Sequence, residues 1–317
     1  MHDPQHARIH RELFLVAFGA NVGVAEPWVT DRLTSLLEEQ RARAGDKLFM
    51  AGDPPEFYYF LREGRVQLVR EGSASWTYES RSVFGMSDAL LERPRVRTAV
   101  ALTDIEAMRV QSEAWIELLE DSFALARAAV LGSVRIVAEL EAKSWSARGS
   151  RRFARPAARG HHGELDVLER LALLTEAPLL RAAGVQTLSD LASLSDVVSF
   201  AAGERLLERG KADGRVLLLA EGEVEARRDA PDARWLGGPG DVVCGTAAFG
   251  ESIDAWEARA RTPARALTFR VEDWIDLMEA HFDLVRSTLG ALSLDREQLL
   301  EELGGTRQAT ASRSTAG

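Results

Sequence analysis

Ala-Gly-Asp-Lys-Leu-Phe-Met-Ala-Gly-Asp, residues 44–53, decides the fold because its pattern occurs twice in the chain. It returns as Ala-Gly-Glu-Arg-Leu-Leu-Glu-Arg-Gly-Lys, residues 202–211. Chance does not keep glycines in register over such a distance, so we interpret the chain as a tandem of two similar domains. Three pairs of glycines are each 158 positions apart: Gly45 and Gly203, Gly52 and Gly210, Gly64 and Gly222.

A second repeated segment lies further along each copy. Residues 113–120, Glu-Ala-Trp-Ile-Glu-Leu-Leu-Glu, return 159 positions later as Glu-Asp-Trp-Ile-Asp-Leu-Met-Glu, residues 272–279. Apolar residues then recur at three- and four-residue spacing from Trp115 to Ala142, which predicts one helix there. The second copy continues in the same way to about residue 303, so each copy ends in helical sequence.

The middle of each copy has the composition of a β structure. Runs of four to six residues rich in aromatic and β-branched types, such as 57–61 and 66–69, are bounded by turns that contain glycine. Short helical patterns at 28–37 and 188–194 precede these runs. The predicted fold class is α+β: two β-roll (jelly-roll-like) barrels, each with flanking N- and C-terminal helices.

Composition also suggests where the domains begin and end. We predict a first domain at 13–142, a second at 164–304 and a disordered tail at 305–317, which is small and polar. Between the domains, 143–163 is rich in arginine, serine, glycine and alanine, which is typical of a basic linker.

The order of these motifs resembles the cyclic nucleotide-binding domain. That family includes the regulatory subunits of cAMP-dependent protein kinase and the bacterial cAMP receptor transcription factors. The resemblance implies a cassette that binds the cyclic phosphate through backbone N–H groups and an arginine. The matching segments are 44–53, 59–66, 84–85, 94–95 and 101–104 in the first copy, and 202–206, 220–224 and 239–243 in the second.

In the first copy, the resemblance places Arg95 at the phosphate-binding arginine and Thr98 at the cassette hydroxyl. Met86 stands where the family has the glutamate that binds the ribose hydroxyl, and a thioether cannot replace that contact. Asp88 adds a negative charge near the expected phosphate, which Arg97 partly offsets. The alternative is that Arg95 forms an ion pair with an acidic residue inside a ligand-free barrel. The candidate ligand-binding residues are Phe84, Gly85, Met86, Ser87, Asp88, Ala89, Arg95 and Thr98.

The second copy departs further from the family pattern. Cys244-Gly245-Thr246 stands where the family has Phe-Gly-Glu, and Asp254 aligns with the phosphate arginine. An acidic group there repels the ligand that the site would bind. We therefore expect the second cassette, with Gly245, Thr246 and Asp254, not to bind cyclic nucleotides. Glu251 is an alternative partner for a different ligand.

Arg151 and Arg152 carry a further resemblance. With Phe153 and Ala154 they are similar to the Arg-Arg-x-Ala pseudosubstrate of kinase regulatory subunits, although here the segment separates the two domains. Two interpretations remain open, a docking segment for an acidic partner and a solvated basic linker.

Composition and motifs exclude several other functions. The net charge of −10 argues against a protein that coats nucleic acid, and only about a dozen residues follow Leu303, too few for a DNA-binding domain. We expect no membrane span, a cytoplasmic location, no cofactor and no metal site, since the chain has a single cysteine and no signal-peptide pattern. No catalytic constellation is present, so we expect a protein that is not an enzyme.

Two functions fit the sequence. One is a regulatory or adaptor protein that senses a cyclic nucleotide, or a related small ligand, weakly and only in its first domain. The other is a scaffold or a partner- and peptide-binding protein that has lost nucleotide binding. Both involve a protein partner, and the second could form a homo-oligomer through the apolar helices at 116–140 and 275–303.

Overall fold

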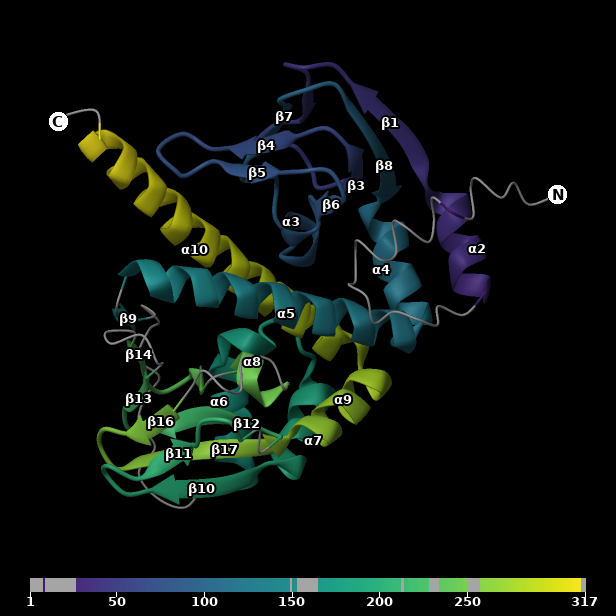
Figure 1. Ribbon diagram of the computed structural model, residues 1–317. Coiled ribbons are helices and arrows are strands. Elements are labelled where there is room, and N and C mark those ends of the chain that lie inside the picture. The colour runs from purple at the N-terminus through teal and green to yellow at the C-terminus, as the bar shows by residue number, and fades with distance from the viewer. Residues whose placement is uncertain are drawn as a thin grey trace. The chain divides into compact units, whose positions relative to one another are not determined.

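The computed structural model describes most of the chain. It covers Arg8 and residues 27–148, 150–152, 165–211, 214–227, 234–243, 245–249 and 257–314. The described residues form two β-rolls with helices before and after each of them (Figure 1). The predicted fold class is therefore confirmed.

The first β-roll consists of two antiparallel sheets that share one apolar core. The strand orders are β1-β8-β3-β6 and β2-β7-β4-β5. Buried side chains from both sheets, including Leu61 from one and Val66 from the other, meet in this core. The strands are β1 (Glu38–Ala42), β2 (Lys47–Phe49), β3 (Phe57–Glu63), β4 (Val66–Val69), β5 (Trp76–Tyr78), β6 (Ser82–Phe84), β7 (Thr98–Ala101) and β8 (Ile105–Gln111), with helix α3 (Ser87–Leu90) between β6 and β7.

Strand β3 is buried on both faces, which explains its continuous apolar run. Tyr59 faces the core between the sheets and contacts Phe84. Tyr58 and Phe60 lie on the opposite face of the strand and contact Trp115 of helix α4 (Ser112–Asp121). The ring centroids of Tyr58 and Phe60 lie 5.5 and 5.8 Å from that of Trp115. Tyr58, Tyr59 and Phe60 thus each have an aromatic neighbour, on alternate faces of the strand.

The repeated glycines occupy tight turns that no other residue could form without strain. Gly64 has φ of 95°, and a Cβ there would lie 2.5 Å from the carbonyl oxygen of Asp104. Its counterpart Gly222 has φ of 83°, and a Cβ would lie 2.4 Å from the carbonyl oxygen of Pro263. The same steric requirement therefore acts in both copies.

The second β-roll repeats the first with one addition. Its sheets have the orders β10-β17-β12-β15 and β11-β16-β13-β14-β9, and β9 pairs with β14 in parallel. The strands are β9 (Ser150–Arg152), β10 (Asp196–Phe200), β11 (Arg205–Leu207), β12 (Arg215–Glu221), β13 (Val224–Arg227), β14 (Arg234–Gly237), β15 (Val242–Val243), β16 (Glu257–Ala260) and β17 (Ala264–Arg270), with helix α8 (Gly245–Ala248) after β15.

Helices precede and follow both β-rolls. The helices predicted at 28–37 and 188–194 are present as α2 and α7. The single helix predicted from Trp115 to Ala142 is wrong, because Ser122 has extended backbone and separates α4 from α5. His281 has extended backbone and separates α9 from α10 at the equivalent position of the second copy. The helices are α2 (Pro27–Leu36), α4 (Ser112–Asp121), α5 (Phe123–Arg148), α6 (Val167–Glu176), η1 (Pro178–Leu180), α7 (Val185–Leu194), α9 (Val271–Ala280) and α10 (Phe282–Ser314).

The compact units differ from the predicted domains. One unit combines Met1–Ser133 with Ser293–Gly317, and the other is Val134–Leu292. Helix α10 continues to Ser314, beyond the start of the predicted tail, because the sequence after Gly305 contains no proline to end it. Helix α5 reaches Arg148 and β9 follows, so the first part of the predicted linker has regular structure.

Candidate functional site

The loop between β6 and β7 carries the cassette predicted in the first repeat. Strand β6 ends at Phe84, whose ring stacks on Tyr59 with centroids 5.0 Å apart. Gly85 follows with φ of 94°, and a Cβ there would lie 3.2 Å from the carbonyl oxygen of Phe57. Glycine is thus required at this turn by the backbone conformation and by close packing.

The next predicted residues are Met86, which precedes helix α3, and Ser87, Asp88 and Ala89, which begin it. Met86 precedes the helix and makes no side-chain hydrogen bond to the N–H groups of its first turn. Ser87 begins the helix, and Asp88 and Ala89 follow with only 8% and 9% of their surfaces exposed. A buried carboxylate therefore lies in the first turn of the cassette helix.

Arg95 is buried, and both Nη groups of its guanidinium donate to backbone carbonyl groups of the chain. Its Nη1 donates to the carbonyl oxygen of Gly85, and Nη2 donates to the carbonyl oxygen of Phe57. The carboxylate of Asp88 lies 3.9 Å from Nη1, and the guanidinium sits 4.2 Å from the ring centroid of Phe49. Burial lowers the pKa of Arg95, and the charge of Asp88 opposes this shift.

The hydroxyl of Thr98 is also used inside the chain. It accepts a 3.0 Å hydrogen bond from the backbone N–H of Ala51. Thr98 is the first residue of β7, so this contact joins the strand to the turn that follows β2. The two polar groups that the resemblance assigned to the ligand, on Arg95 and Thr98, therefore both have partners in the chain.

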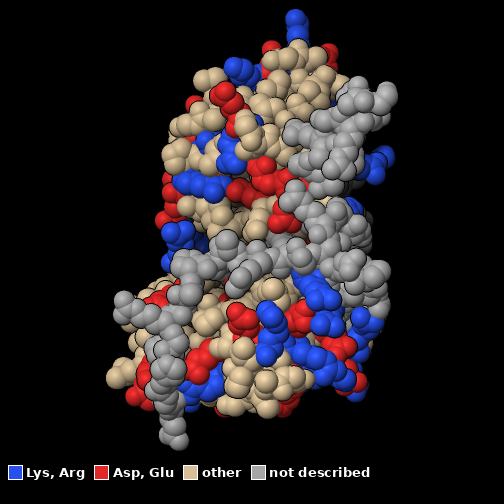
Figure 2. Space-filling view, turned by 90° about the vertical axis from the view of Figure 1, so that its left-hand side faces the viewer, with Lys and Arg blue, Asp and Glu red and all other residues tan. Residues whose placement is uncertain are grey.

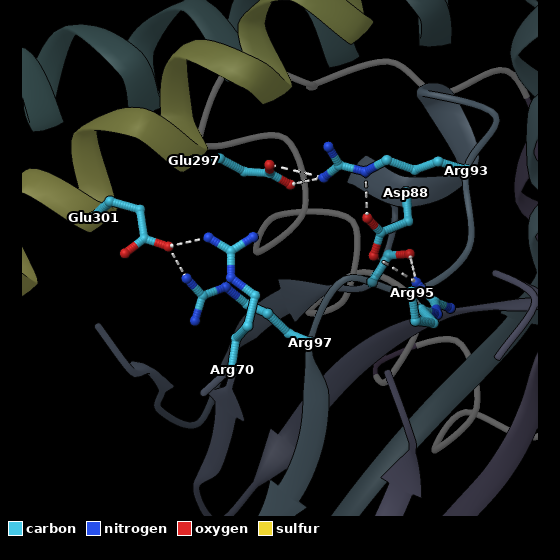
Figure 3. Close-up of polar contacts among 8 residues, drawn as sticks. Arg70, Asp88, Arg93, Arg95, Arg97, Glu297 and Glu301 are labelled. Atoms are coloured by element: carbon cyan, nitrogen blue, oxygen red, sulfur yellow. Dashed lines mark hydrogen bonds and ion pairs between the residues drawn. The ribbon is translucent and has the colours of Figure 1, made fainter. Parts of the chain in front are cut away.

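Asp88 is the start of a chain of ion pairs that leads out of the cassette (Figure 3). Its Oδ1 accepts a 2.9 Å hydrogen bond from Nε of Arg93. The Nη2 of Arg93 donates to both carboxylate oxygens of Glu297, at 2.6 and 2.7 Å. Burial lowers the pKa of Arg93, but its bonds to Glu297 and Asp88 outweigh burial and leave the pKa raised.

A second group of charged residues lies beside the first. The guanidinium of Arg97 stacks 3.7 Å from the ring centroid of Trp76 and donates to the carbonyl oxygen of Ala74 at 2.6 Å. The same guanidinium pairs with Glu301, whose carboxylate also accepts from Arg70 at 3.2 Å. Figure 3 shows Arg70 and Arg97 pointing toward Glu301 from the sheet.

The sequence prediction missed most of this network. Arg97 was expected to offset Asp88, but it pairs with Glu301, and Asp88 is neutralised by Arg93 and Arg95 instead. A signal was present, since arginine occurs at every second position from 93 to 97 and Glu297 and Glu301 have the spacing of neighbours on a helix face.

The second cassette differs from the first in its local structure. Gly245 is the first residue of helix α8, whereas Gly85 precedes its helix in the left-handed conformation. The hydroxyl of Thr246 donates a 3.0 Å hydrogen bond to the carboxylate of Glu141 on α5. That this cassette binds no cyclic nucleotide stays a prediction. Cys244, Glu251 and Asp254 lie outside the described residues.

Arg151 and Arg152 are the last two residues of strand β9, which pairs with β14 over Arg234–Leu236. The backbone of this segment is therefore paired with the second β-roll. Its role as a docking segment stays a prediction.

The comparison with protein families decides which family the chain belongs to. The family described as "Cyclic nucleotide-binding domain" matches this chain at residues 39–122 and 197–281. Together these segments are more than half of the chain. The chain belongs to this family. The two matched segments coincide with the two β-rolls, so the tandem of cyclic nucleotide-binding domains predicted from the repeat is confirmed.

Individual relatives are distant. A cAMP-dependent protein kinase regulatory subunit of Neurospora crassa is 25% identical over 95 residues, which are 29% of this chain and 25% of the relative. One of Hypocrea atroviridis is 25% identical over 93 residues, 29% of this chain and 20% of the relative. The match thus spans a quarter or less of these relatives. The cAMP-bound structure of PfPKA-R aligns with a TM-score of 0.37 and 16% identity, over 96% of this chain and 93% of that chain.

Two kinds of feature are absent from the described residues. None of their helices combines the length and the apolar composition that a membrane span requires. No group of three or more His, Cys, Asp or Glu in the described part of the chain is arranged to hold a metal ion.

Proposed function

We propose that this protein is a non-catalytic regulatory or adaptor protein of the cyclic nucleotide-binding family that acts through a protein partner. We further propose that its first domain no longer uses Arg95 to bind a cyclic phosphate. One observation carries this proposal: the guanidinium of Arg95 is buried, and its two Nη groups donate to two backbone carbonyl groups beside the carboxylate of Asp88.

Binding a phosphate at Arg95 would require these internal contacts to break. Each buried carbonyl left without a donor costs about 1–3 kcal/mol. Asp88 would also remain close to the incoming anion, and like charges at such a distance repel. Met86 offers no acceptor for a ribose hydroxyl, so little new binding energy would offset these losses.

Weak nucleotide sensing in the first domain is the second candidate. It is supported by the presence of Arg95 and Thr98 at the positions that match the family motif. In this case the ligand would bind a minor conformation in which Arg95 leaves the carbonyl oxygens of Gly85 and Phe57.

The relatives in Neurospora crassa and Hypocrea atroviridis are named as kinase regulatory subunits, and this supports a protein partner for the present chain. The surface agrees with a protein rather than a nucleic acid as partner. On the face shown in Figure 2, basic and acidic side chains are interspersed. This face has no continuous basic patch of the kind that binds a phosphate backbone.

Calorimetric titration of the full chain with cAMP, cGMP, other nucleotides and nucleosides tests the proposal. We expect no heat of binding up to millimolar ligand. Binding that is present in the wild type and absent in a folded Arg95→Ala variant would instead establish the sensor, with circular dichroism confirming that the variant is folded.

A further inference from the structure

The end of helix α10 belongs to the same compact unit as the first β-roll. Residues 293–304 of this helix, here named the C-terminal strap, come from the sequence that follows the second β-roll. Arg296, Leu300 and Gly304 follow one another at intervals of four residues along it, and Glu297 and Glu301 are also four residues apart. They therefore form one face of the helix.

Apolar and aromatic contacts place this face on the first β-roll. Leu300 packs against the core cluster of the roll. Arg296 donates a 3.0 Å hydrogen bond to the hydroxyl of Tyr78, and its guanidinium lies 5.6 Å from the centre of that ring. Gly304 faces Ala74 so closely that a Cβ on the glycine would lie 2.2 Å from the Cβ of Ala74.

The two acidic side chains of this face meet three basic ones. Glu301 accepts from Arg97, from Arg70 at 3.2 Å and from the backbone N–H of Ala74 at 3.1 Å. Glu297 accepts both its bonds from Arg93. Two guanidinium groups and one backbone N–H around a single carboxylate form a complete set of donors for an anion.

Among the arginines of this surface, Arg97 is the one whose burial calls for such an anion. The side chain of Arg97 is only 2% exposed, and burial lowers its pKa while Glu301 opposes the shift. A buried guanidinium without a counter-charge is strongly unfavourable, so the surface is stable only when an acidic group covers it.

The surface also lies on the cassette that gives the family its ligand site. Arg93 and Arg97 flank Arg95 in the segment between α3 and β7, and Asp88 in α3 pairs with Arg93. The other cassette shows a related contact, because Thr246 bonds to Glu141 on the helix that follows the first β-roll. In both cassettes a glutamate of the other repeat's long helix is thus bound.

We propose that the first β-roll carries a binding site for an acidic amphipathic helix, and that the C-terminal strap occupies this site in the structure. The site is formed by Arg70, Ala74, Tyr78, Arg93 and Arg97. The proposal deepens the proposed function and rests on it, since it identifies what binds the first cassette. A partner that uses this surface must present an acidic helix and displace the strap. The strap is therefore an autoinhibitory contact.

Hydrogen–deuterium exchange of the full chain tests this proposal with two variants. Glu301→Lys reverses the central charge, and Gly304→Val forces the helix away from Ala74 without changing charge. A released segment stays part of α10 but loses the packing that stabilises it, so its backbone hydrogen bonds should open more often. We therefore expect amides of 293–304, and the amide of Ala74, to exchange about tenfold faster or more in both variants.

Controls make the result specific. Gln298 is exposed between the two glutamates, so Gln298→Lys changes the charge of the helix at a position that faces away from the roll. We expect wild-type exchange in this variant, and unchanged exchange of strand β12 in all three. Valine has a higher helix propensity than glycine. Faster exchange in Gly304→Val therefore cannot result from a loss of helix propensity.

Wild-type exchange of the strap in both Glu301→Lys and Gly304→Val would overturn the proposal, and so would equally fast exchange in Gln298→Lys. The nucleotide titration is a separate test. Nucleotide binding by the wild type would overturn the proposed function without altering these exchange rates.

Discussion

The carboxylate of Glu301 pairs with the buried guanidinium of Arg97, a residue 204 positions earlier in the chain. Arg97 in turn stacks on Trp76, so this ion pair links helix α10 to the interior of the first β-roll. Stability of the first unit and the position of residues 293–304 should therefore change together.

The first prediction concerns Arg97 itself. Arg97→Ala removes the stacking on Trp76, the bond to Ala74 and the partner of Glu301. We expect a loss of about 2–4 kcal/mol in the free energy of unfolding of the first unit, measured with urea. Arg65→Ala is the matched control, because that arginine is exposed, and we expect a change within about 0.5 kcal/mol. Similar losses in the two variants would contradict the prediction.

The second prediction compares two glycines with the same backbone conformation. Gly45 has φ of 93° and open space around its Cβ position, whereas a Cβ on Gly64, with φ of 95°, would lie 2.5 Å from the carbonyl oxygen of Asp104. Gly45→Ala should lose about 1 kcal/mol for the left-handed conformation alone. Gly64→Ala should lose at least about 2 kcal/mol more, because backbone must move. Equal denaturation midpoints would show that the turn relaxes freely.

The third prediction concerns alkaline pH. Burial raises the pKa of Tyr58 well above its usual value of about 10. The folded protein keeps this phenol neutral, while the unfolded chain ionises it near pH 10. Stability from Tyr58 is thus fully present below pH 10 and is lost as the pH rises further. We expect Tyr58→Phe to lose stability less steeply than the wild type between about pH 10 and 11.5, in thermal unfolding. An unchanged slope would exclude this residue as the cause.

The fourth prediction concerns an anion in place of Glu301. Glu301→Ala leaves Arg70, Arg97 and the N–H of Ala74 without their carboxylate. Inorganic phosphate should bind these donors and raise the melting temperature of this variant more than that of Gln298→Ala, which serves as the control for general salt effects. The difference should grow with phosphate concentration. Identical shifts would show that the donors do not form an anion site.

Sequence alone predicted the two β-rolls because their turns carry local signals. Glycines such as Gly64 and Gly222 are required by geometry that depends on a few neighbouring residues, and the strands between them have a recognisable composition. The predicted cassette residues from Phe84 to Thr98 lie at the end of β6, in α3 and at the start of β7, and their role in ligand binding stays a prediction.

The strap could not be predicted in this way. Helical periodicity shows that 293–304 has a face that can pack, but not which β-roll it packs against. The contacts that decide this, such as those of Glu301 with Arg70 and Arg97, join residues 231 and 204 positions apart. The helix breaks at Ser122 and His281 were missed for a related reason, because neither glycine nor proline marks them.

The division between the compact units falls at the same place in both long helices. It follows Ser133 in α5 and Leu292 in α10, which are 159 positions apart like the other equivalent positions of this region. During synthesis, the ribosome completes the first β-roll early but makes the strap only after the whole second repeat. The first unit can therefore be completed only after the second repeat has been made, and until then Arg93 and Arg97 lack the carboxylates of Glu297 and Glu301.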